Sequence, residues 1–137
     1  MTLPALTATQ QMIRFRQRWP NFEIKEVRGV LVARGELQPS SLTRAYSVRL
    51  EYRIPSVPEV YIESPRLVRR GSEPDKEIPH TYDSGKIGEE RPCVFQPGTD
   101  WRPTMHISDS IMPWLMSWLV DYELWLALGK WTGGGVH

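Results

Sequence analysis

Apolar and polar residues alternate through residues 22–64, and this period of two is typical of β-strands with one buried face. The clearest run is residues 45–53, in which every second side chain from Tyr46 to Tyr52 is aliphatic or aromatic. Similar runs occupy residues 22–27, 29–37 and 59–64. Because no helical pattern separates these runs, they predict a four-stranded antiparallel meander.

A helical period precedes the strands, in residues 7–19. Thr7 or Thr9 could cap the start of this helix, and Pro20 ends it. The predicted apolar face consists of Met12, Ile13, Phe15 and Trp19. The arginines at positions 14, 16 and 18 form either a solvated face or a basic docking surface for a protein partner.

A second helical pattern begins near Pro113 and ends at Gly129. Proline suits the first turn of a helix because its missing N–H has no partner there, and glycine suits the position after the last turn. Between them runs an apolar stripe that we expect to cover the sheet, made of Trp114, Leu115, Trp118, Leu119, Tyr122, Trp125 and Leu126. Together these patterns predict one α+β domain over residues 1–137, with an N-terminal helix, the meander and C-terminal helices.

Composition narrows the class of protein. The net charge is only +1, with 17 basic and 16 acidic residues, which argues against a nucleic-acid partner. Neither a long apolar run nor a leader-like N-terminus is present, so we expect no membrane span and no signal peptide. A single cysteine excludes an internal disulfide and fits the reducing cytoplasm. The histidines at 80, 106 and 137 lack metal-ligand spacing, so we expect no metal and no cofactor.

The candidate chemistry lies in residues 78–101, which contain the one cysteine, Cys93. Prolines and glycines surround it, so we expect it on an irregular segment just after a strand. A thiol presented to solvent on such a segment is a candidate nucleophile, and the alternative is a small buried apolar side chain. Arg91 would lower the pKa of the thiol, whereas Glu89 and Glu90 would raise it.

Motifs in this half of the chain resemble a known family. The strings I-P-H-T-Y, P-C-V-F and W-R-P-T, followed by the tryptophan-rich residues 111–137, are similar to bacterial ubiquitin-conjugating-enzyme-like proteins of type II (short) CBASS anti-phage operons. The resemblance is strong over residues 78–137 and only architectural over residues 1–77. It implies a UBC-like fold and a cysteine that forms a thioester with the C-terminus of a partner CD-NTase (a cGAS-like nucleotidyltransferase), priming cyclic-nucleotide signalling.

The resemblance also implies roles for individual residues. Cys93 corresponds to the thioester-forming cysteine, and His80 to the histidine of the family's His-Pro-Asn motif. The asparagine of that motif, which is assigned to oxyanion stabilisation, has no counterpart, because the chain's only asparagine is Asn21. His80, Tyr82 or backbone N–H groups near Cys93 are the candidates for that role.

Asp109 and His106 are candidate supporting groups, because either could accept the proton of an attacking amine. The structural alternatives are an acid near a helix N-terminus and a loop histidine. Two other functions are open at this point: a UBC-fold binding module in which Cys93 is inert, and a cysteine protease, for which no Cys-His-Asn signature is evident. The sequence leaves the oligomeric state open.

Overall fold

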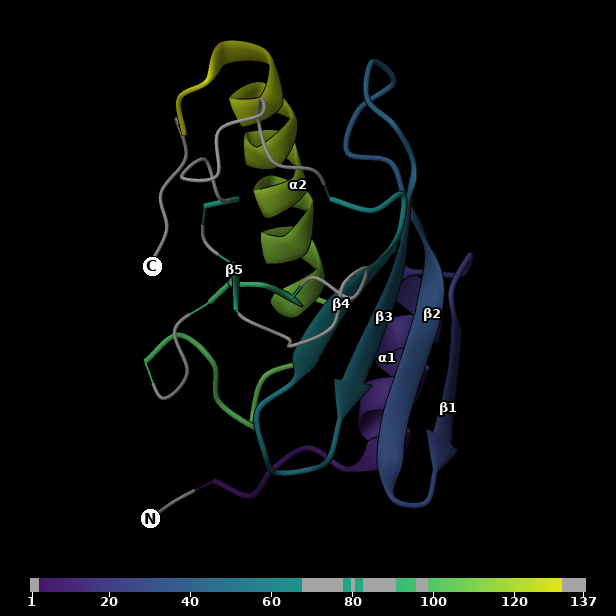
Figure 1. Ribbon diagram of the computed structural model, residues 1–137. Coiled ribbons are helices and arrows are strands. Elements are labelled where there is room, and N and C mark those ends of the chain that lie inside the picture. The colour runs from purple at the N-terminus through teal and green to yellow at the C-terminus, as the bar shows by residue number, and fades with distance from the viewer. Residues whose placement is uncertain (1–2, 68–77, 80, 83–90, 96–98, 132–137) are drawn as a thin grey trace.

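The computed structural model of the chain describes residues 3–67, 78–79, 81–82, 91–95 and 99–131. Its elements are, in order, α1 (Ala8–Arg18), β1 (Glu23–Val27), β2 (Val30–Leu37), β3 (Tyr46–Tyr52), β4 (Glu59–Ser64), β5 (Thr81–Tyr82), β6 (Arg91–Pro92) and α2 (Ile111–Leu128). Strands β1 to β4 form one antiparallel sheet in sequence order, and β5 pairs with β6 in a separate two-stranded sheet (Figure 1). The predicted α+β fold and four-stranded meander are confirmed, with one C-terminal helix among the described residues.

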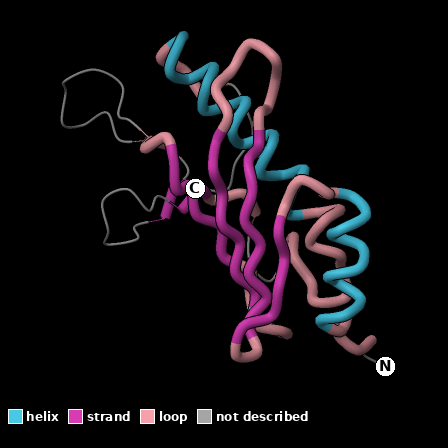
Figure 2. Tube along the Cα trace, turned by 90° about the vertical axis from the view of Figure 1, so that its right-hand side faces the viewer, coloured by secondary structure: helices cyan, strands magenta, loops and turns pink. Residues whose placement is uncertain are grey.

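The meander buries one face and leaves the other polar. The buried residues of β3 are Tyr46, Val48, Leu50 and Tyr52, as the sequence predicts. The register carries this alternation across the sheet, because Leu50 lies opposite Ala33 of β2 and Val60 of β4, which are both buried. Both helices contribute to the same hydrophobic core as these residues, and they therefore pack on the apolar face (Figure 2).

A capping box starts α1. The side-chain oxygen of Thr7 accepts the backbone N–H of Gln10 at 3.1 Å, and the side-chain oxygen of Gln10 accepts the backbone N–H of Thr7 at 2.8 Å. Of the two candidate caps, Thr7 is therefore the one used. The helix ends before Pro20, as predicted.

All residues of the predicted apolar face of α1 except Ile13 pack in or against the core. Phe15 is fully buried, but Ile13 is 53% exposed, and Gln11 takes a place in the core. The ring of Phe15 meets that of Phe22 edge to face, with centroids 5.7 Å apart. Phe22 in turn lies over Gly35 of β2, where a Cβ atom would come within 2.6 Å of the ring. Glycine at this position lets the segment before β1 pack closely on the sheet.

The C-terminal helix has the predicted ends and the predicted apolar stripe. Pro113 lies in its first turn, and Gly129 follows its last turn with a left-handed φ of 75°. In the stripe, Trp114 and Leu126 are half-buried and the other residues are buried. The helix covers part of the sheet, as expected.

A polar contact fastens α2 to the start of β3. The rings of Tyr46 and Tyr122 meet edge to face, with centroids 6.3 Å apart. The Tyr46 hydroxyl donates to the carboxylate of Glu123, which also pairs with Arg44 at 3.4 Å. Burial raises the pKa of Tyr46, and the hydrogen bond to Glu123 raises it further, so the phenol keeps its proton.

Candidate functional site

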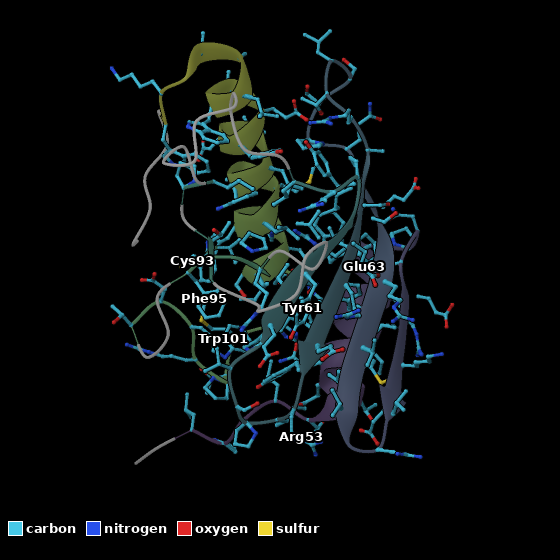
Figure 3. All side chains as sticks on the ribbon, viewed as in Figure 1. Arg53, Tyr61, Glu63, Cys93, Phe95 and Trp101 are labelled. Carbon is cyan, nitrogen blue, oxygen red and sulfur yellow. The ribbon has the colours of Figure 1, made fainter. Side chains whose placement is uncertain are left out.

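Cys93 follows β6 on an irregular segment, as predicted. Because β6 lies beside β4, the cysteine sits near the edge of the large sheet (Figure 3). Aromatic contacts hold the residues that follow Cys93 in the chain. The ring of Phe95 lies 6.1 Å from that of Trp114 in α2, and Trp101 meets Tyr52 of β3 edge to face at 5.6 Å. These contacts connect the cysteine segment to both the sheet and α2.

The thiol of Cys93 is not presented to solvent in this structure. Only 3% of the residue is exposed, and its Sγ lies 3.7 Å from the carbonyl oxygen of Phe95, where the thiol is a weak donor. The expectation of a solvent-presented thiol is therefore wrong for this conformation. An acyl-transfer function must include a change that exposes Sγ, whereas an inert thiol needs none.

Some of the other residues expected at the site lie among the described residues, and some do not. His80 lies outside the described residues, so its role at the site stays a prediction. Tyr82 lies in β5 opposite Arg91 of β6, and its side chain falls outside the description. Asn21 donates from Nδ2 to a backbone carbonyl of β2 at 3.0 Å. This bond ties Asn21 to the sheet, and the candidate oxyanion donors named from the sequence stay predictions.

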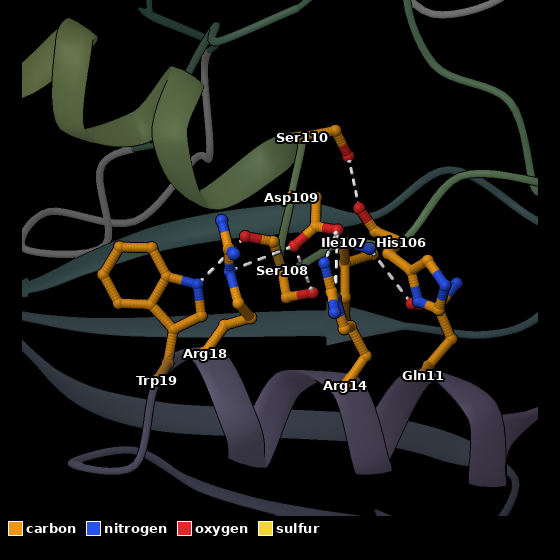
Figure 4. A network of polar contacts seen from close by, with 9 residues as sticks. All are labelled: Gln11, Arg14, Arg18, Trp19, His106, Ile107, Ser108, Asp109 and Ser110. Atoms are coloured by element: carbon orange, nitrogen blue, oxygen red, sulfur yellow. Dashed lines mark hydrogen bonds and ion pairs between the residues drawn. The ribbon is translucent and has the colours of Figure 1, made fainter.

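Asp109 belongs to the interface between α1 and the segment before α2 (Figure 4). Its carboxylate accepts hydrogen bonds from Arg14 Nε and from Ser108 Oγ, both at 3.1 Å, and pairs with Arg18 at 3.5 Å. Burial raises the pKa of Asp109, but the contacts with Ser108 and the two arginines outweigh burial and lower it overall. A carboxylate with a lowered pKa is a weaker base, which favours the structural role for Asp109. Arg16 donates from Nη2 to the carbonyl oxygen of Ile24 at 3.1 Å, so all three arginines on α1 are engaged within the molecule.

His106 lies in the same segment before α2. Its carbonyl oxygen accepts the hydroxyl of Ser110 at 2.7 Å, and its ring is half-buried, with a buried Nδ1 that hydrogen-bonds no described residue. Gln11 of α1 hydrogen-bonds to the backbone of the same segment. Its Nε2 donates to the carbonyl of Met105 at 2.9 Å, and its Oε1 accepts the N–H of Ile107 at 3.0 Å (Figure 4). These bonds explain why a glutamine is buried among the apolar residues of the core.

The polar face of the sheet carries a cluster that sequence reasoning missed. The ring of Tyr61 on β4 contacts two guanidinium groups, with its centroid 4.3 Å from Cζ of Arg49 and 5.6 Å from Cζ of Arg91. Arg49 also pairs with Glu63 at 3.0 Å and with Glu51 at 3.2 Å. The alternation of β3 could have placed Arg49 on this face, but no pattern relates Arg91 to a tyrosine so distant in the sequence.

The described part of the chain offers limited chemistry. It contains no group of three or more side chains that could hold a metal ion. Nor does it contain a helix that is long and apolar enough to cross a membrane. What it supplies is a thiol at the end of a strand, hydrogen-bonding groups and aromatic packing.

The class of protein follows from the arrangement of its helices and strands. An N-terminal helix, a four-stranded antiparallel meander and a C-terminal helix, with a cysteine between sheet and helix, define an α+β protein of UBC-like architecture. The chain belongs to the family of type II CBASS E2 proteins, whose model it matches over residues 11–137. The match extends through the N-terminal half, where the motifs gave only an architectural resemblance. A comparison with curated proteins gives no match.

Proposed function

We propose that Cys93 forms a thioester with the C-terminal carboxyl group of a partner CD-NTase, and that this conjugation primes the partner's cyclic-nucleotide signalling in anti-phage defence. Membership of the type II CBASS E2 family supports a conjugating protein that acts in this system. The observation that carries the proposal is that the chain's one cysteine follows a strand beside the sheet of a UBC-like fold. The expected compartment is the cytoplasm, where a thiol stays reduced.

In the proposed reaction, the Cys93 thiolate attacks the carbonyl carbon of an acyl group that arrives as a thioester. A new bond from Sγ to this carbon forms, the bond to the donor's sulfur breaks, and the donor leaves as a thiol after taking up the proton that Cys93 released. His80, Tyr82 or a nearby backbone N–H donates to the oxyanion of the intermediate. An acceptor amine then attacks the same carbon, which yields an amide and returns the Cys93 thiol.

We leave Asp109 and His106 outside this reaction. Asp109 is paired with Arg14 and Arg18, and its carboxylate is a weak base. The described contacts of His106 lie within the segment before α2. Transthiolation does not need a strong general acid or base near Cys93, because a thiol leaves readily without general-acid assistance.

A second function, a non-catalytic UBC-fold module that holds the CD-NTase or another partner, is favoured by one observation. Cys93 is 3% exposed, and a peptide terminus cannot reach a thiol in that state. Alkylation by a maleimide separates the two functions. For a conjugating enzyme, we expect the CD-NTase to accelerate labelling of Cys93 by shifting the protein toward a state with an exposed thiol. For a binding module, labelling should stay slow with and without the partner.

Co-expression with the CD-NTase of the same operon tests the proposed conjugation, because the cell then supplies any activated donor. We expect a band of the combined mass on a non-reducing gel that disappears on treatment with a thiol and is absent for Cys93→Ala. Cys93→Ser is the matched variant, since an ester formed by serine should resist the thiol. Absence of any adduct, together with unchanged nucleotide synthesis for Cys93→Ala, would leave only the binding module.

A further inference from the structure

We propose that Tyr61 and Arg91 are positioning residues for Cys93, because the contact between them holds β6 against β4 and so fixes the place of the thiol. The consequence for conjugation rests on the proposed function, whereas the anchoring itself does not. Neither residue would touch the reacting atoms. Their effect would reach the thiol through the strand that leads directly into it.

Backbone pairing gives β6 little support of its own. The strand has two residues, Arg91 and Pro92, and it pairs with β5, which is equally short. Pro92 has no N–H to donate, and an isolated two-stranded hairpin is marginal in water. Although β6 lies beside β4, it belongs to a different sheet. Side-chain contacts add a connection between β6 and β4 that the pairing of β6 with β5 does not give.

The Tyr61 ring is suited to that connection. Cζ of Arg91 lies 5.6 Å from its centroid, within the distance of about 6 Å at which a cation is attracted to an aromatic face. The ring is itself held in place, since its hydroxyl donates to Glu59 and Arg49 stacks on it at 4.3 Å. Arg49 of β3 is bound to Glu63 of β4 at 3.0 Å, so the ring is fixed to both strands.

The geometry gives a signature that general destabilisation does not share. Cys93 follows Arg91 by two positions and is 3% exposed. Loss of the Tyr61 ring should free β6, which raises the access of a small reagent to Sγ. The same loss should slow conjugation, because a thiol in a variable position meets a carbonyl carbon in the correct geometry less often. Reactivity toward a small reagent and conjugation should thus change in opposite directions.

The test measures both quantities for Tyr61→Leu, Tyr61→Phe and Arg34→Gln. For Tyr61→Leu we expect alkylation by N-ethylmaleimide to be roughly three- to tenfold faster than in the wild type, with less CD-NTase adduct. Tyr61→Phe keeps the aromatic face, so its alkylation rate and its amount of adduct should stay close to those of the wild type. Arg34 is the matched control, because it lies on the same polar face and pairs with Glu63 at 3.7 Å, whereas the described cation–π contacts of the Tyr61 ring are with Arg49 and Arg91. Arg34→Gln should leave both quantities at their wild-type values.

An unchanged alkylation rate in Tyr61→Leu would overturn the inference, and so would an equal acceleration in Arg34→Gln. If Tyr61→Leu does not fold, Arg91→Met takes its place, because it removes the cation and keeps a long side chain. The same acceleration is expected for it, and a wild-type rate would overturn the anchor. If the wild type forms no adduct, the conjugating function fails, while the alkylation rates still decide whether the anchor exists.

Discussion

At the scale of single residues, Gln11 joins α1 to the segment before α2 with two hydrogen bonds. It is fully buried, and its side chain satisfies one backbone carbonyl and one backbone N–H of the segment before α2. In Gln11→Ala both backbone groups lose their partners, so we expect the free energy of unfolding to fall by about 2–4 kcal/mol. Urea denaturation measures this change.

The matched variant for that measurement is Gln17→Ala, on the exposed side of the same helix. It should change stability by less than about 0.5 kcal/mol, as surface substitutions usually do. Equal stabilities for the two alanine variants would show that the bonds of Gln11 do not stabilise the fold.

The sequence predicted residues whose environment is set by local periodicity, and it failed where a tertiary contact decides. Tyr46 and its alternating neighbours on β3 are buried as expected, because a strand in a sheet has only two faces. On α1, hydropathy favoured Ile13 over Gln11, yet Gln11 is buried, four positions before Phe15. The helical spacing of Gln11 and Phe15 carried a signal, but the polarity of glutamine obscured it. Only the backbone groups that it meets across the interface justify its burial.

At the scale of elements, the turn between β1 and β2 invites a stabilising substitution. Its two residues, Arg28 and Gly29, have φ values of 52° and 81°, the pattern of a type I′ hairpin. Asparagine tolerates this backbone region better than arginine does. Arg28→Asn should therefore raise the free energy of unfolding by about 0.5–1 kcal/mol in chemical denaturation. A lower stability for this variant would contradict the account of the turn.

A glycine under an aromatic ring gives the opposite prediction for β2. In Gly35→Ala the new methyl group would come within 2.6 Å of the Phe22 ring, so the ring or the strand must move. We expect a loss of about 1–3 kcal/mol in thermal or chemical unfolding, as for other overpacked cores. Because Phe22→Leu gives the methyl group room, adding it should recover part of the loss, and no recovery would argue against the clash.

The longer a helix or strand is, the better the sequence predicted it. Each strand of the meander is long enough to show a period of two, and Pro113 and Gly129 marked the ends of α2. Strands β5 and β6 have two residues each, which is too short for any period. A strand was expected before Cys93, but the pairing of β6 with β5 and its place beside β4 could not be predicted.

At the scale of the whole molecule, the ion pairs of Asp109 make stability depend on pH. The pKa of Asp109 in the folded protein is lowered from its usual 3.8, so the ion pairs contribute stability above pH 3.8. This contribution is lost as the pH falls through the lower, folded pKa. Wild type should thus exceed Asp109→Asn in stability at pH 7, and the difference should shrink toward pH 2. A difference that does not change with pH would exclude this role of the carboxylate.

The burial of Cys93 is also a property of the whole molecule. Motifs identified the cysteine and the family, but its exposure depends on how the chain around it packs on the sheet and on α2. Local sequence carries no signal for such packing. The role of His80 and the extent of the domain over residues 1–137 stay predictions.

The central claim is that Sγ of Cys93 carries the C-terminus of the CD-NTase. Peptide mass spectrometry of the purified, co-expressed complex under non-reducing conditions tests it most directly. We expect a cross-linked pair in which the terminal carboxyl of the CD-NTase is joined to the peptide containing Cys93, and in which hydroxylamine releases both parts. A complex that contains only unmodified Cys93 peptide, or a terminus joined to another residue of this chain, would contradict the account.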